Sequence, residues 1–166
     1  MKFETIPFGK PEAFNVRIEI SEGSKVKYEF NEDYQAFQVN FVFRHGFFWP
    51  FNYGEIFGTL AGDGDKLDAI VLSSQPLAMG SIVLCRPVAM AEIIDRGEVD
   101  NKIFCVPIVD GSLDNYQDLD SFSEEQLRSY EDFFRELAMQ KNKILEVKGF
   151  HGKARTIEEI EKSVIK

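Results

Sequence analysis

The change of hydrophobic period along the chain is the feature that most limits its possible folds. From Phe14 to about Leu113, apolar residues alternate with polar ones or form short runs broken at Gly, Asn and Asp, which is typical of strands joined by turns. After Leu113 the apolar spacing becomes helical. Five or more strands followed by two helices predict an α+β domain.

The first predicted strand shows the alternation clearly. One of its faces carries only apolar side chains: Phe14, Val16, Ile18 and Ile20. Arg17 and Glu19 lie on its other face, and in the next strand Lys27 and Glu29 share a face. Further strands are predicted over residues 67–72, 82–94 and 102–109. This number of strands favours a small closed or partly closed barrel.

Two helices are predicted near the C-terminal end, each by a capping box. Ser123 with Gln126 begins the first helix, whose apolar stripe runs to about Lys141. Thr156 with Glu159 begins a short second helix. Because no repeat and no linker composition divides the chain, we expect one domain over residues 1–166.

The chain is strongly acidic, with 28 Asp and Glu against 19 Lys and Arg and a formal net charge of −9. This charge disfavours nucleic acid and anionic membranes as partners and favours cations. No apolar run approaches the roughly 20 residues of a membrane span, and residues 1–5 contain no apolar signal segment. We therefore expect a soluble, cytoplasmic protein, with Cys85 and Cys105 as reduced core residues.

The segment 62–72 concentrates three aspartates, Asp63, Asp65 and Asp68, between glycines and a predicted strand. Carboxylates at the edge of an apolar interior need a cation, so a hard metal ion is one interpretation. A solvated Asp/Gly turn is the other. An EF-hand loop is excluded, because Leu67 would occupy a ligand position and Ser74 the final glutamate position.

A second acidic group lies between two predicted strands, at residues 95–102. Alone it fits an ordinary polar hairpin loop. Together with the first group and with Glu19, Lys27 and Glu29, it provides carboxylates and lysines from several strands. If these converge, they form a site where divalent ions neutralise a phosphate substrate.

In their order and approximate spacing, these segments resemble the soluble family I inorganic pyrophosphatases. Asp63-Gly64-Asp65-Lys66-Leu67-Asp68 resembles the family signature. Five further segments agree: Ile18-Glu19-Ile20, Lys27-Tyr28-Glu29, Pro50-Phe51-Asn52-Tyr53-Gly54, Cys85-Arg86-Pro87-Val88 and the run from Asp95 to Lys102. The resemblance covers roughly residues 14–150. It implies a five-stranded OB-like closed β-barrel with two peripheral C-terminal helices.

The resemblance also implies Mg²⁺-dependent hydrolysis of pyrophosphate to two phosphates by a metal-activated water, with Asp65 as the base. The implied metal-binding carboxylates are Asp63, Asp68, Asp100, Asp95, Glu19 and Glu29. The implied substrate-binding residues are Lys27, Tyr53 and Lys102. The seven carboxylates and two lysines would carry −5 of the −9 net charge. A homo-oligomer, a hexamer in bacterial relatives, is implied as well.

The sequence departs from the family on the side of the site that would bind the leaving phosphate. Phe41 stands where the family has an arginine, and Leu137 and Ala138 stand where it has a Tyr-Lys pair. Arg44 and Lys141 are the candidates for compensating phosphate contacts. Two alternatives therefore stay open: hydrolysis of another phosphoanhydride, or weakly active binding of divalent cations and phosphate.

Overall fold

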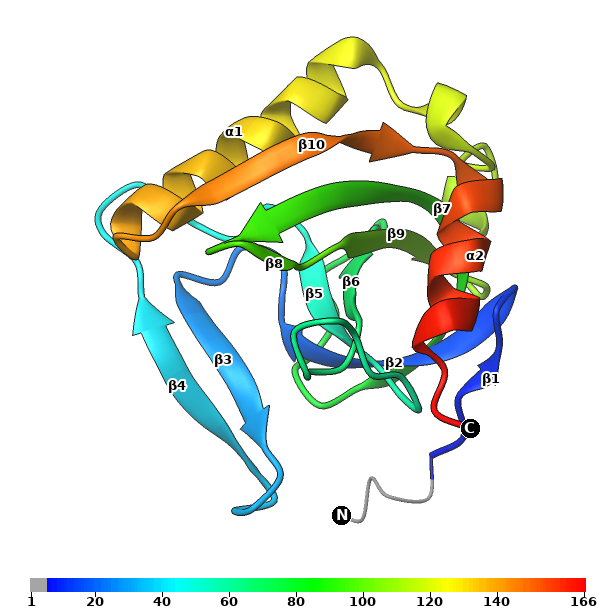
Figure 1. Cartoon of the computed structure of the whole chain (residues 1–166), viewed down its shortest axis with the longest axis horizontal. Helices are drawn as coiled ribbons and strands as arrows, with labels where there is room; N and C mark the ends of the chain where they lie inside the picture. Colours follow the sequence, from blue (N-terminus) through cyan, green and yellow to red (C-terminus); the bar gives the residue numbers. More distant parts are fainter. Residues whose placement is uncertain (1–5) are drawn as a thin grey trace.

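Five strands close into a barrel in the computed structural model, which describes residues 6–166 (Figure 1). In barrel order they are β2 (Ala13–Ile20), β5 (Asn52–Ile56), β6 (Asp68–Val71), β9 (Lys102–Pro107) and β7 (Ile82–Asp95), and β7 pairs again with β2. The predicted α+β fold with a five-stranded closed barrel is confirmed. Residues 1–5, where the absence of a signal segment was predicted, lie outside the described residues.

The barrel is mixed, because β6 and β9 run parallel while the other barrel pairs are antiparallel. In the parallel pair, Asp68 lies opposite Lys102. Three further strands extend the sheet outside the barrel: β1 (Gly9–Lys10) on β2, and β8 (Glu98–Val99) and β10 (Leu145–His151) on β7. The strand β10 was not predicted.

A separate two-stranded hairpin projects from the barrel, formed by β3 (Val26–Asn31) and β4 (Ala36–Val42) (Figure 1). In its register Lys27 lies opposite Phe41. The hairpin therefore carries the predicted phosphate ligand Lys27 and the carboxylate of Glu29 outward from the barrel wall on one strand.

Two helices pack on the sheet, α1 (Glu124–Gln140) and α2 (Lys153–Ser163), and two short 3-10 turns precede them at Gly111–Leu113 and Leu119–Ser121. The predicted capping box of α1 is confirmed, because Ser123 and Gln126 exchange both side chain to backbone hydrogen bonds. The predicted cap of α2 is wrong. That helix begins at Lys153, and Thr156 lies inside it, donating its hydroxyl hydrogen to the Gly152 carbonyl.

The two faces of the barrel strands carry two apolar clusters. One cluster includes Phe14, Val16 and Ile18 and is covered in part by Ile160 of α2. The other lies against α1 and includes these strand residues: Ile20, Tyr53, Ile70 and Phe104. Asp68 and Lys102 lie on this second face, two positions before Ile70 and Phe104. Polar side chains at one end of an apolar face thus form the floor of a cavity.

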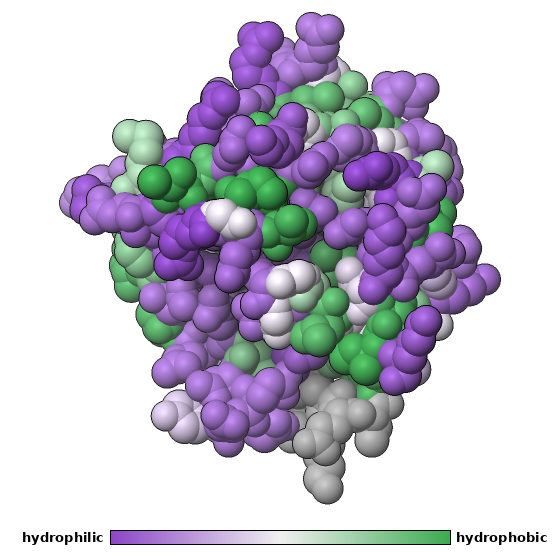
Figure 2. Space-filling view, viewed as in Figure 1, coloured by the Kyte–Doolittle hydropathy of each residue, from purple (hydrophilic) through white to green (hydrophobic). Residues whose placement is uncertain are grey.

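Several other predictions concern burial. All four apolar residues of the first strand are fully buried, as expected. Cys85 and Cys105 are free and buried, which confirms their assignment to the core. The visible surface is mostly hydrophilic (Figure 2), and no helix in residues 6–166 is long and apolar enough to cross a membrane.

Candidate active site

A cavity of about 820 Å³ opens between the hairpin, the barrel and the C-terminal end of α1. Its lining includes ten carboxylates: Glu19, Glu29, Glu32, Glu55, Asp63, Asp65, Asp68, Asp95, Glu98 and Asp100. It also includes five lysines and one arginine: Lys27, Lys66, Lys102, Lys141, Lys143 and Arg96. Of the predicted site residues, all but Arg44 line this cavity, so the predicted convergence of separate strands is observed.

At the centre of the cavity, Lys102 joins two carboxylates. Its Nζ lies 2.5 Å from Asp68 Oδ2 and 2.8 Å from Asp100 Oδ1. Burial raises the pKa of Asp68 to about 6 against the opposing effect of the Lys102 charge. Burial also raises the pKa of Tyr53, whose ring centroid lies 5.7 Å from Lys102 Nζ. Tyr53 therefore stays a neutral hydroxyl group beside this cluster.

The loop that carries Asp63 and Asp65 is a tight turn. Asp63 Oδ1 accepts the Asp65 N–H at 3.0 Å, and Gly64 has a φ of +90°, a conformation that glycine adopts without strain. The pKa of Asp65 is raised by burial and then by the charges of Asp63, Glu29, Glu55 and Asp100. A carboxylate with a raised pKa among other carboxylates is a good proton acceptor.

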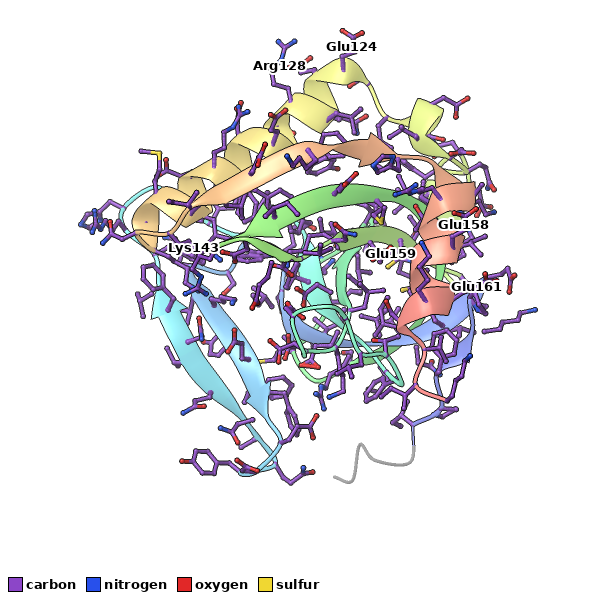
Figure 3. The ribbon with its side chains drawn as sticks, in the orientation of Figure 1. Glu124, Arg128, Lys143, Glu158, Glu159 and Glu161 are labelled. Carbon is purple, nitrogen blue, oxygen red and sulfur yellow. The ribbon has the colours of Figure 1, made fainter. Side chains whose placement is uncertain are left out.

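Asp95 lies at the end of β7, and Lys143 Nζ is 2.5 Å from Asp95 Oδ2. Lys143 belongs to the segment that joins α1 to β10 (Figure 3). Asp95 Oδ1 is buried and accepts no hydrogen bond from the described residues, although Arg96 Nε lies 3.4 Å away. A buried carboxylate oxygen with no hydrogen-bond donor has free capacity for a ligand.

Glu19 and Glu55 form a second acidic group that the sequence analysis recognised only in part. Glu19 is 4% exposed and accepts the Phe30 N–H at 2.8 Å. Burial, followed by a hydrogen bond with Glu55, raises the pKa of Glu19 to about 10. Burial beside a second carboxyl group thus disfavours the ionised form of Glu19.

Glu55 connects this acidic group to a cationic one. Arg17, which is 1% exposed, has its Nη2 3.4 Å from both Glu55 oxygens and 3.3 Å from Glu32 Oε1, and its guanidinium lies 3.7 Å from the Phe30 ring centroid. Lys66 Nζ contacts Glu32 at 2.7 Å. The sequence signal that could have found Glu55 is its place two residues after Tyr53 on the same strand face.

The structure places some of the predicted phosphate ligands in the cavity and one outside it. Lys27 lines the cavity and pairs with Glu29 at 2.7 Å. Arg44 does not line the cavity: its side chain is exposed, and its backbone N–H donates to Gln140 Oε1 at 3.0 Å. The structure therefore does not bring Arg44 together with the other predicted phosphate ligands, because the chain leaves β4 before this residue. Lys141 does line the cavity.

The donor set fits divalent cations such as Mg²⁺, since carboxylate oxygens are their usual protein ligands and Asp95 Oδ1 is available. Within residues 6–166, no three His, Cys, Asp or Glu side chains are grouped closely enough to enclose an ion. Instead, the Lys102 ammonium occupies the position between Asp68 and Asp100.

A closed barrel with an acidic, lysine-containing cavity offers carboxylates to cations and ammonium groups to an anionic ligand at one place. The family model for inorganic pyrophosphatase matches residues 16–166. The inorganic pyrophosphatase of Synechocystis sp. is 38% identical over 152 residues, covering 90% of this chain and 89% of that protein. That of Aquifex pyrophilus is 35% identical over 171 residues, covering 99% and 96%.

Solved structures agree with the sequence comparison. The inorganic pyrophosphatase of Thermus thermophilus superimposes with a TM-score of 0.91 at 33% identity, covering 98% of this chain and 97% of that one. The chain belongs to the inorganic pyrophosphatase family.

Proposed function

We propose that this protein hydrolyses inorganic pyrophosphate to two phosphates and that it requires Mg²⁺. The observation that carries the proposal is the Asp68–Lys102–Asp100 cluster at the centre of the cavity. It offers carboxylates for cations and an ammonium group for phosphate oxygens at one place. Membership of the family supports pyrophosphate as the substrate.

The proposed metal ligands come from four strands, β2, β3, β6 and β7, and from two loops. Asp63, Asp68 and Asp100 would hold the activating ions, Asp95 would hold a further ion that arrives with substrate, and Glu19 and Glu29 would act through water molecules. Bound Mg²⁺ would lower the pKa of water and neutralise the phosphate charge.

Asp65 is the proposed base. Its backbone position is fixed by the Asp63 side chain, and its raised pKa lets it accept the proton of the attacking water. Lys102 donates to Asp68 and Asp100, which leaves the third hydrogen of its ammonium group for a phosphate oxygen. Lys27 and the neutral hydroxyl of Tyr53 would donate to other phosphate oxygens.

Phosphate release from pyrophosphate tests this proposal. We expect release with Mg²⁺ and none after chelation with EDTA. Asp65→Asn should lower kcat roughly 10²- to 10⁴-fold, the usual contribution of a general base. Asp132→Asn, on an exposed position of α1, is the matched control and should keep the wild-type rate.

The same assay separates the alternatives. Release from nucleoside di- or triphosphates but not from pyrophosphate would contradict the proposed substrate. No release from any phosphoanhydride would contradict catalysis and leave cation and phosphate binding. A homo-oligomer, hexameric by resemblance, and a cytoplasmic location stay predictions, which size-exclusion chromatography with light scattering and cell fractionation would check.

A further inference from the structure

Three lysines line the part of the cavity between the hairpin and the end of α1, and they differ in their partners. Lys27 pairs with Glu29 at 2.7 Å, and Lys143 pairs with Asp95 at 2.5 Å. No carboxylate among residues 6–166 lies within 4.0 Å of Lys141 Nζ. Its hydrogen-bond acceptor is the neutral amide oxygen of Asn40, at 3.4 Å.

The surroundings of Lys141 disfavour its charged ammonium form unless a counter-ion is present. The residue is half-buried, and its Nζ lies 5.9 Å from the centroid of the Phe41 ring. Burial, followed by the like charges of Lys27 and Lys143, lowers the pKa of Lys141 to about 8, while Glu29 opposes this shift. A half-buried ammonium beside two others is stabilised most simply by an anion that enters the cavity.

The backbone around Lys141 is held in place by several contacts. Its N–H bonds to the Leu137 carbonyl at the end of α1, and the Lys143 N–H bonds to the Ala138 carbonyl. Gln140, which is 8% exposed, ties the end of the helix to the segment after β4 through the Arg44 N–H. The backbone that carries the Lys141 side chain is therefore held in place at the edge of the cavity, and such preorganisation favours anion binding.

We propose that Lys141, oriented by Asn40, binds a phosphate group of the substrate in the part of the cavity between the hairpin and the end of α1. This inference rests on the proposed function and adds a substrate ligand to it. The position fits its surroundings: Leu137 lines the cavity and the Phe41 ring lies beside Lys141 Nζ, and neither offers a polar group to a phosphate oxygen. Lys141 would supply the positive charge that these two residues lack.

The test compares Lys141→Met with Lys148→Met, which makes the same chemical change at an exposed lysine paired with Glu146 on β10. Isothermal titration with inorganic phosphate in the presence of Mg²⁺ should show roughly 10- to 100-fold weaker binding for Lys141→Met, the usual effect of losing a charged hydrogen bond. Lys148→Met should bind like the wild type. In pyrophosphate hydrolysis, kcat/KM should fall by a similar factor for Lys141→Met alone.

Two further variants control for a folding defect, since Lys141 is the C-cap residue of α1. Lys141→Arg keeps the charge and should keep phosphate affinity within about fivefold, whereas Lys141→Gln keeps a polar side chain and should lose affinity as Lys141→Met does. Folded Lys141→Met and Lys141→Gln proteins with wild-type phosphate affinity would overturn the proposal.

The two proposals fail differently. A wild-type protein that releases no phosphate from pyrophosphate contradicts the proposed function, and the titration with inorganic phosphate still decides on Lys141. A wild-type protein that hydrolyses pyrophosphate, with Lys141→Met equal to it in kcat/KM, contradicts only the role of Lys141.

Discussion

Replacing Lys102 by methionine tests how the carboxylates of the cavity are held together without a metal ion. The Lys102 side chain is 8% exposed, and its ammonium group lies 2.5 Å from Asp68 and 2.8 Å from Asp100. Removing one partner of a buried ion pair costs roughly 3–5 kcal/mol, because the remaining charge is left uncompensated. For a domain of this size, 1 kcal/mol shifts the Tm by roughly 2–4 °C. In EDTA we therefore expect Lys102→Met to unfold roughly 6–20 °C below the wild type.

The same variant also predicts a change in how strongly Mg²⁺ stabilises the protein. If Asp68 and Asp100 are metal ligands, the variant frees both carboxylates for the ion, so its Tm should rise more on addition of saturating Mg²⁺ than the Tm of the wild type. Thermal unfolding followed by circular dichroism at a fixed protein concentration measures both shifts. The exposed pair of Lys148 and Glu146 supplies the control, because Lys148→Met should cost no more than about 1 kcal/mol. Equal Mg²⁺ shifts in the variant and the wild type, or a loss below about 3 °C in EDTA, would refute this reasoning.

Three further predictions concern other contacts. Gly54→Ala would place a methyl group 1.8 Å from the Arg17 carbonyl oxygen, so β2 and β5 must separate and the Tm should fall by at least about 5 °C; Gly62→Ala, with its nearest atom at 3.9 Å, is the control in the same unfolding experiment. Glu55→Gln removes the charge that faces Arg17 and Lys66, and chemical denaturation should show a loss of roughly 1–3 kcal/mol; an unchanged midpoint would contradict the assigned contacts. Asp118→Ala removes the acceptor of the Leu119 and Lys153 N–H groups and should cost about 1 kcal/mol at pH 7. Because those bonds lower the pKa of Asp118 in the folded state, its contribution is present above the ordinary pKa and disappears as pH falls through the lowered value, so variant and wild type should converge in acid. A difference that persists in acid would contradict this assignment.

Local patterns in the sequence predicted the elements whose partners are close along the chain. The strand β2 and the capping box of α1 were both confirmed. The single apolar face predicted for β2 ends at Ile18, because the register with β5 shifts there and Ile20 packs in the other apolar cluster. The strand β10 was missed because its register with β7 shifts between Val147 and Gly149, and this irregularity interrupts the period of two. The start of α2 was placed too late because Asp118, 35 residues away, accepts the Lys153 N–H and stabilises an earlier start.

Contacts between residues far apart in the sequence also explain which site residues were predicted and which were missed. The clustered aspartates and the strand residues Glu19, Lys27 and Tyr53 line the cavity, as the sequence predicted. Glu55 was missed because it becomes a cavity residue only when β5 pairs with β6 and places it opposite Asp68. Arg17 was correctly assigned to the face of Glu19, but its burial depends on Phe30 and Glu32 from the hairpin.

The parallel pairing of β6 with β9 has a consequence for how the chain folds. Asp68 and Lys102 are 34 residues apart in sequence and meet only when these two strands align in one register. A slip by one residue would turn Lys102 toward the opposite face, where its neighbours Ile103 and Cys105 now pack, and would bury an ammonium group among apolar side chains. The charges in the cavity therefore penalise misaligned strands during folding, so the residues proposed for chemistry also help the chain to select one strand alignment.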